Sequence, residues 1–233
     1  MQETYRIGNA QSIGSRHIQS NYFASKIITE TECLAVLSDG AIDHINGRRC
    51  AILAVEACVQ EFMHIPREAK PPLFFDFVAA RILRDMRELL YLGKTPYLSL
   101  SIQYFRDGQL FYYTVGSNRL FLFDGMDYHI LSGGSGAGIV QGKAPGSART
   151  DMGQGRLPVA AGAQCGCVAY KKGMTAGMLS LGAWEALREK ELVSILRRKG
   201  HPYEKAQRML LRIKEKNQKA AGNATVLLVE GCL

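Results

Sequence analysis

The residue with the clearest potential for chemistry is Asp39, which ends the apolar run in "ECLAVLSDG". A carboxylate at the end of a buried strand costs free energy unless another group or water meets it. Its partner could be a metal ion, an arginine or water. Asp43 follows in the next loop, where a carboxylate is expected to cap the helix that begins near Gly47.

Three other patterns are weaker candidates for chemistry. The run "GGSGAG", 133–138, has glycines spaced as in a phosphate-binding loop, but neither a helical pattern nor a Lys-Ser/Thr pair follows it. Cys165-Gly-Cys167 could bind a soft metal only with a second pair of ligands, and no cysteine falls in a CxxC pair. None of the five histidines stands in a recognisable nucleophilic triad.

The elements that must position Asp39 follow from hydrophobic periodicity. Short alternating or apolar segments predict strands at 21–28, 32–38, 97–105, 110–115, 118–123, 128–132, 156–161, 165–172, 175–183 and 223–231. Apolar residues at helical spacing predict helices at 47–63, 73–92, 184–199 and 203–218. Hairpins with paired helices at two points favour an α+β fold with largely antiparallel sheets over a repeating βαβ pattern. We expect one domain over 1–233, with a flexible glycine-rich loop at about 132–155.

Length and charge narrow the class of protein. The 233 residues suffice for one sizeable core, and neither a signal peptide nor a membrane-spanning run is visible, so we expect a cytoplasmic location. The net charge is +8, and residues 197–219 hold nine Lys or Arg against two Glu. This stretch could face nucleic acid or another anionic surface. A solvated helix face explains it more simply, because Tyr203 is the only aromatic residue among the basic ones.

Five short segments occur in a characteristic order: "RHIQSN" at 16–21, "DGAIDHING" at 39–47, "TVGSNRLFLF" at 114–123, "GMLSLGAWEAL" at 177–187 and "AAGNATVLLV" at 220–229. In this order and at these intervals they resemble bacterial members of the type 2C family of metal-dependent Ser/Thr protein phosphatases, over essentially the whole chain. The resemblance implies a four-layer α-β-β-α sandwich, with two mainly antiparallel sheets packed face to face between helix pairs. It also implies two Mg²⁺ or Mn²⁺ ions that activate a water for attack on phosphorus.

The family's functional residues are only partly present at the matching positions. Arg16 matches the arginine that grips the phosphate, Asp39 the aspartate that bridges both metals, and Gly40 the glycine whose carbonyl assists it. The other five acidic positions of the family carry different residues here: Ser20, Asn21, Ser117, Leu181 and Gly222. One aspartate cannot offset two dications, and the Leu181 side chain offers no oxygen at all. The fold-type matches persist, namely Arg119, Trp184 and Asn223-Ala224-Thr225.

The resemblance leads to a first hypothesis and two alternatives. The first is a catalytically inactive phosphatase-like protein of bacterial signalling that binds a protein, a phosphoprotein among the candidates, and needs no cofactor. The second is a Mg²⁺- or Mn²⁺-dependent phosphatase with a reduced or rearranged site around Asp39, to which Asp43, Asp151 or Glu185 could contribute. The third is a basic-surface binder of nucleic acid or another anionic surface, with nucleic acid the least expected partner. As the partner of Asp39 we expect an arginine, with Arg16 nearest, or water, ahead of a single weakly held cation.

Overall fold

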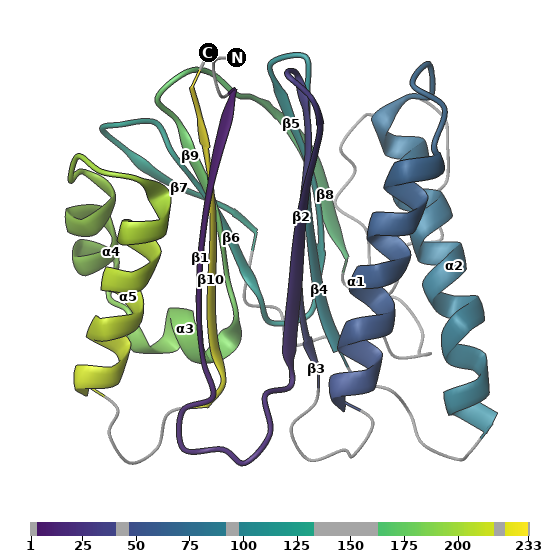
Figure 1. The fold of residues 1–233 in the computed structure, drawn as a ribbon, viewed down its shortest axis with the longest axis horizontal. Helices are drawn as coiled ribbons and strands as arrows, with labels where there is room; N and C mark the ends of the chain where they lie inside the picture. The colour runs from purple at the N-terminus through teal and green to yellow at the C-terminus, as the bar shows by residue number, and fades with distance from the viewer. Residues whose placement is uncertain (1–3, 41–46, 92–97, 133–162, 217–221, 233) are drawn as a thin grey trace.

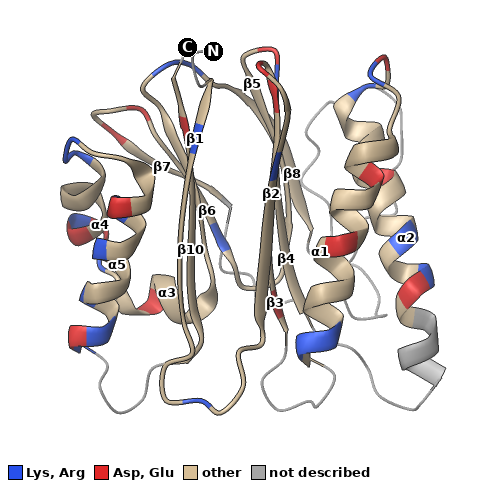
Figure 2. Ribbon diagram, viewed as in Figure 1, with Lys and Arg blue, Asp and Glu red and all other residues tan. Residues whose placement is uncertain are grey.

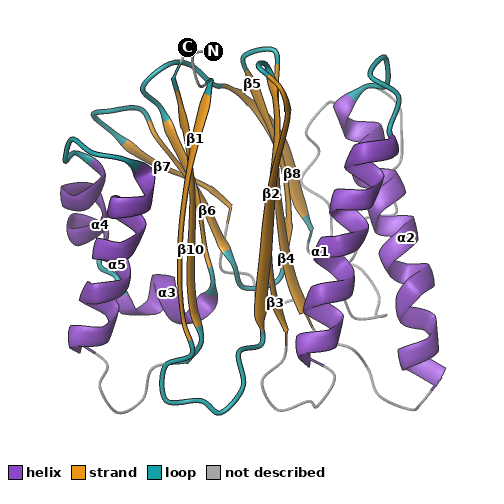
Figure 3. Ribbon diagram, viewed as in Figure 1, coloured by secondary structure: helices purple, strands orange, loops and turns teal. Residues whose placement is uncertain are grey.

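The computed structural model describes residues 4–40, 47–91, 98–132, 163–216 and 222–232. Two five-stranded antiparallel sheets lie face to face between two layers of helices (Figure 1, Figure 3). The first sheet has the order β1 (Tyr5–Ser12), β10 (Ala224–Gly231), β9 (Thr175–Leu179), β6 (Arg119–Phe123) and β7 (Tyr128–Ser132). The second has the order β2 (Asn21–Thr29), β3 (Glu32–Gly40), β4 (Leu98–Arg106), β5 (Gln109–Val115) and β8 (Gln164–Ala169).

The helices cover the outer face of each sheet. Helices α1 (Gly47–His64) and α2 (Pro71–Tyr91) pack on the second sheet, while α3 (Leu181–Ala186), α4 (Glu189–Leu196) and α5 (Pro202–Lys216) pack on the first. The predicted four-layer α+β sandwich is therefore confirmed. None of the helices in the described ranges is long and apolar enough to cross a membrane.

Strand β3 shows how this fold positions Asp39. Its apolar run is continuous because both faces are buried, Leu34 and Val36 against the α1–α2 layer and Cys33 and Leu37 against the first sheet. Alternation along a strand puts every second residue on the same face. Asp39 therefore continues the row that points between the two sheets.

The hairpins and long helices lie close to their predicted positions. The β4–β5 turn holds Asp107 at φ 48° and Gly108 at φ 72°. Positive φ at both central residues is the signature of the tight turn that Asp-Gly favours between antiparallel strands. The strand predicted at 156–161, nearly all of the glycine-rich loop and the last residues of the helices predicted to reach 92 and 218 lie outside the described residues.

Three predictions near the C-terminal half are wrong in detail. The strand predicted over 175–183 ends at Leu179, because Ser180 becomes the N-cap of α3. The helix predicted over 184–199 is broken, since Leu187 and Arg188 are extended and Arg188 opens α4 in a capping box with Glu191. The strand predicted over 165–172 ends at Ala169. The apolar periodicity runs on across the helix break because α3 and α4 share one core.

Strand β1 was not predicted from the sequence. Its segment "YRIGNAQS" mixes polar residues with small ones and shows a burial pattern without strict alternation. The strand forms by pairing along its length with β10, from Tyr5 opposite Gly231 to Ser12 opposite Ala224. Its partner is more than two hundred residues away, so no local pattern marks it.

Candidate functional site

The matched positions gather at one end of the sandwich, the lower end in Figure 1. Asp39 lies near the end of β3, and its cross-strand neighbours are Asn21 at the start of β2 and Ser99 in β4. From the other sheet come the start of α3, after β9, and Asn223, directly before β10. The structure thus brings together the residues that the motif order predicted would lie together.

Asp39 finds its partner in the backbone of the facing layer. Its carboxylate accepts a hydrogen bond from the N–H of Leu181, at the first position of α3. Burial raises the pKa of the Asp39 carboxyl to about 7, and this single N–H offsets only part of the rise. The expected arginine is not the partner, because no ion pair in the described part of the chain joins Asp39 to Arg16, whose side chain is exposed.

Asn223 ties the N-terminal loop to the base of β10. Its Oδ1 accepts hydrogen bonds from the backbone N–H of Ser20 at 2.8 Å and from Ser20 Oγ at 2.6 Å. Its Nδ2 donates to the carbonyls of Ile13 at 2.9 Å and Ile18 at 3.1 Å. One buried amide therefore holds both ends of the loop that carries Arg16.

Asn21 sits between the sheets with one polar atom unsatisfied. Its Nδ2 donates to Thr225 Oγ1 at 3.0 Å, and Gln11 Nε2 donates to the same hydroxyl at 3.1 Å. The residue is 1% exposed, and its Oδ1 has no hydrogen-bond partner in the described residues. A buried acceptor of this kind carries a desolvation cost unless water or a ligand reaches it.

Ser117 is fixed by contacts on both sides. Its N–H donates to Ser99 Oγ at 2.9 Å, and the two hydroxyls lie 2.9 Å apart. Trp184 Nε1 donates to the Ser117 carbonyl at 2.7 Å, and the Arg119 guanidinium lies 4.1 Å from the centre of the Trp184 ring. The preceding Gly116 is required, because its φ is 92° and a Cβ there would lie 2.4 Å from Ser99 Oγ.

The α3 start is joined directly to β10. Ser180 N–H donates to the Thr225 carbonyl at 3.1 Å, and Thr225 N–H donates to Ser180 Oγ at 2.9 Å. Gly182 lies so close that a Cβ would be 2.5 Å from the Asn223 carbonyl oxygen. The Leu181 position thus contributes a backbone N–H to the site.

The start of α1 lies against the other side of the site. A Cβ on Gly40 would come within 2.0 Å of the Gly47 carbonyl oxygen, so the helix begins directly beside the end of β3. Arg48 donates to the Gln19 carbonyl at 2.6 Å. Asp43 and Asp151 lie outside the described residues, and Glu185 is exposed on α3.

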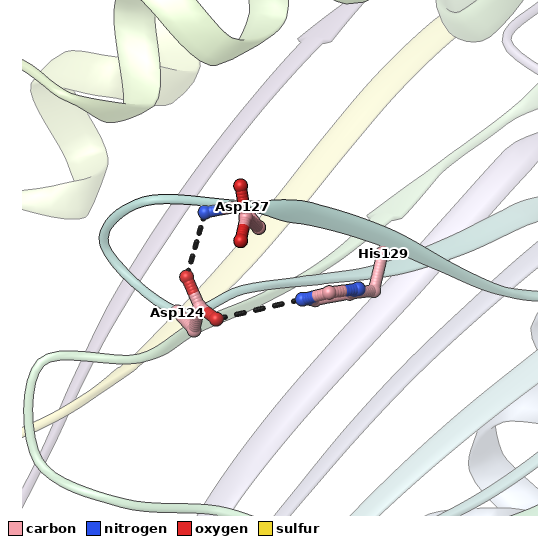
Figure 4. Close-up of side chains that lie close together, drawn as sticks. All are labelled: Asp124, Asp127 and His129. Atoms are coloured by element: carbon pink, nitrogen blue, oxygen red, sulfur yellow. Dashed lines mark hydrogen bonds and ion pairs between the residues drawn. The ribbon is translucent and has the colours of Figure 1, made fainter.

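Within the described residues, the group of side chains spaced as metal ligands lies elsewhere. Asp124, Asp127 and His129 come together, exposed, at the β6–β7 turn (Figure 4). Asp124 Oδ1 accepts the backbone N–H groups of Met126 at 2.9 Å and Asp127 at 2.7 Å, and these bonds lower the pKa of the Asp124 carboxyl. The hydrogen bonds of the turn account for the position of Asp124, and Asp127 takes part in them through its backbone N–H.

The residues that connect the matched positions were not predicted from the sequence. Asn223 and Thr225 were recognised only as retained family residues, and their hydrogen bonds to Ser20 and Asn21 were not foreseen. Gln11 was missed because its strand was missed. Arg48 carried a visible signal, since two adjacent arginines at the start of a helix oppose the helix dipole.

Comparison with solved structures identifies the fold. The catalytic domain of the serine/threonine protein phosphatase PstP in complex with two manganese ions superposes with a TM-score of 0.79 at 11% identity, covering 98% of this chain and 99% of that one. The serine/threonine phosphatase of S. agalactiae gives 0.74 at 15% identity, covering 97% and 99%. RsbX in complex with magnesium gives 0.68 at 15% identity, covering 99% and 97%. No protein-family model and no curated protein sequence matches the chain.

The chain therefore has the fold of bacterial type 2C Ser/Thr phosphatases over nearly its full length. At these identities the likeness concerns the arrangement of the backbone, and the chemistry has to be argued from this chain's own residues.

Proposed function

We propose that this protein is a catalytically inactive relative of the type 2C phosphatases that binds phosphorylated protein segments and acts as a regulatory module. The observation that carries the proposal is the state of Asp39. It is the single carboxylate among the six matched positions, and it is engaged with the backbone N–H of Leu181.

The donor set does not fit a pair of dications. Mg²⁺ and Mn²⁺ are held by several carboxylate oxygens, whose negative charge offsets that of the ions. Here the Ser20 hydroxyl donates to Asn223, the Ser117 hydroxyl pairs with Ser99, and Leu181 and Gly222 offer no side-chain oxygen. We derive no metal-dependent step for this site.

What remains suited to a phosphorylated ligand is Arg16. A guanidinium presents a planar fork of donors that matches the oxygens of a phosphate group. Arg16 is exposed on the loop between Ile13 and Ile18, whose carbonyls Asn223 holds in place. Such an arrangement can bind a phosphate group on a protein surface without cleaving it.

Two measurements test this function together. Calorimetric titration with Mn²⁺ and Mg²⁺ is expected to give no two-site binding, and p-nitrophenyl phosphate is expected to show no turnover with either ion. A phosphoserine peptide is expected to bind, and Arg16→Gln to weaken that binding about tenfold, the value of one charge-assisted contact. Micromolar binding of two metal ions would overturn the proposal.

A second candidate function is phosphatase activity from a reduced site around Asp39. The observation that favours it is the unsatisfied Oδ1 of Asn21, which lies on the strand position paired with Asp39 and could serve as one ligand of a single cation. Turnover of p-nitrophenyl phosphate that requires Mn²⁺ and disappears in Asp39→Ala would establish it.

The third possibility, a basic binding surface on α5, has less support. Lys205 pairs with Glu230 at 3.1 Å and Arg212 with Glu215 at 2.8 Å, and Lys216 pairs with Glu191. These ion pairs neutralise part of the local charge, as expected for a helix face that supports the fold. Salt-sensitive binding of nucleic acid that is lost when Arg208 and Lys214 are neutralised would support a basic binding surface on α5.

A further inference from the structure

The start of α1 places positive charge where a helix least favours it. Arg48 and Arg49 are the second and third residues of this 18-residue helix, and its first turn contains no acidic residue. The N-terminal end of a helix carries partial positive charge, which favours anions and disfavours cations. Both arginines are exposed, so packing does not explain them.

Contacts place this pair at the rim of the candidate site. The helix begins against Gly40, the residue after Asp39. Arg48 reaches across to the carbonyl of Gln19, which directly precedes Ser20 and lies three residues after Arg16. In Figure 2 the basic residues at the start of α1 and in the β1–β2 loop lie at the same end of the molecule.

The three arginines carry positive charge that no ion pair with a described acid offsets, as do several other exposed basic residues of the chain. Among the described residues, no ion pair includes Arg16, Arg48 or Arg49. Lys205 and Lys216, in contrast, each pair with a glutamate. Adjacent cations without a counter-charge repel each other and attract anions from solution.

Neutral side chains occupy five of the positions where the family has acids, so these positions carry no negative charge that would repel an anion. At the five changed positions the side chains are neutral, and the carboxyl of Asp39 is partly protonated near neutral pH because burial raises its pKa to about 7. Among the described residues, the rim therefore carries three arginines and no acid that forms an ion pair with them.

We propose that Arg48 and Arg49 form a second anion-binding subsite beside Arg16, so that this end of the molecule binds a peptide carrying a phosphorylated residue and a second phosphate or acidic group. The proposal extends the proposed function, because it takes the phosphate at Arg16 as the first of the two anions. The two subsites can be tested separately.

Fluorescence anisotropy with labelled peptides is the deciding experiment. The probes are one short peptide in three forms, with no, one and two phosphoserines, and a single-stranded DNA of similar charge. The variants are Arg48→Gln with Arg49→Gln, and Arg49→Gln alone, which disturbs no described hydrogen bond. The matched control, Arg198→Gln with Lys199→Gln, removes the same charge from exposed residues between α4 and α5.

The second phosphate is expected to tighten binding to the unaltered protein about tenfold. The double variant is expected to lose this gain, and Arg49→Gln, which keeps the Arg48–Gln19 hydrogen bond, is expected to bind the singly phosphorylated form as before. Arg49→Gln should lose part of the gain, and the control should lose none. If the second phosphate raises the affinity of the double variant as much as that of the unaltered protein, the Arg48–Arg49 subsite is overturned. The proposed role of Arg16 is not affected by that result.

Two further results separate this inference from the proposed function. Binding that needs both phosphoserines, and is unaffected by Arg16→Gln, would retain the Arg48–Arg49 subsite while removing the role of Arg16. DNA binding as tight as that of the doubly phosphorylated peptide would overturn the phosphopeptide assignment in favour of a general polyanion surface.

Discussion

Asp39 and Asp124 are the same residue type in opposite surroundings. Asp39 lies between two sheets with one backbone N–H as its partner, and its pKa is raised to about 7. Asp124 is exposed at a turn, where two backbone N–H groups and His129 lower the pKa of its carboxyl. The acid between the sheets is thus poorly suited to ionise, while the acid that stays ionised accepts the hydrogen bonds of a turn.

The number of carboxylates in a cluster does not by itself identify a metal site. The β6–β7 turn has two carboxylates and a histidine within ligand distance of one another, and the hydrogen bonds of the turn account for the position of Asp124. Among the described residues, the candidate site has one carboxylate, Asp39, and a network of serine, asparagine and threonine contacts. The contribution of each region to the free energy of unfolding can be tested with separate variants.

The largest effect is expected from Asn223→Ala at the candidate site. The change removes four hydrogen bonds, to Ser20 twice and to Ile13 and Ile18. At roughly 0.5–1.5 kcal/mol each, the free energy of unfolding should fall by about 3 kcal/mol. Urea denaturation measures it.

Gln207→Ala is the matched control for this prediction. Its amide makes one described hydrogen bond, to the Asn9 carbonyl at 3.4 Å, so a loss below about 0.5 kcal/mol is expected. Equal losses in the two variants would mean that Asn223 does not hold the site together.

Asp39→Asn is expected to stabilise the protein at pH 8 by about 2 kcal/mol, after discounting for partial solvent access. The folded protein binds more protons than the unfolded chain between the usual aspartate pKa of 3.8 and about 7, so the contribution of Asp39 to stability decreases as the pH rises through this range. The asparagine cannot ionise and its oxygen can still accept the Leu181 N–H. Unfolding curves recorded at pH 5 and pH 8 check this.

A variant that is no more stable than the unaltered protein at pH 8 would contradict the raised pKa. The difference between the two proteins should shrink at pH 5, where the Asp39 carboxyl is protonated in the folded state.

Asp124→Asn should have the opposite pH dependence and a smaller effect. Because the pKa of Asp124 is lowered on folding, its contribution to stability is present above the usual aspartate pKa and is lost as the pH falls. The variant should therefore be slightly less stable at pH 7 and should match the unaltered protein in acid. Identical pH profiles would show that the turn does not depend on this charge.

The smallest effect is expected from metal ions. Because the described contacts at the candidate site are hydrogen bonds within the protein, adding Mn²⁺ or EDTA should change Tm by less than about 1 °C. Differential scanning calorimetry with Mn²⁺ in excess checks this, with Mg²⁺ as a second ion. A large rise in Tm with Mn²⁺ would support the reduced metal site around Asp39.

Local patterns predicted most of the fold. The two-sided burial of β3, the Asp-Gly turn after β4 and the amphipathic α1 each leave a signal within a few residues. Strand β1 leaves none, because its pairing with β10 determines it. The break at Leu187 and Arg188 was hidden because the apolar spacing continues across it.

The sequence predicted which residues lie together at the candidate site, but it did not predict the hydrogen bonds between them. The order of the motifs indicated that Ser20, Asp39 and Leu181 would lie together, and they do. The hydrogen bond from Leu181 to Asp39 could not be predicted, because it depends on a helix beginning at the residue where we expected a strand to continue. A backbone donor has no side-chain signature in a sequence.

The Asn223 contacts also constrain the order of events during synthesis. The loop that carries Arg16 is held by a residue 210 positions after Ile13 along the chain. A nascent chain that has not yet emerged past Asn223 lacks these hydrogen bonds and the pairing of β1 with β10. The loop therefore reaches its final conformation only after most of the chain has left the ribosome, and a truncated translation product cannot present Arg16 in the same way.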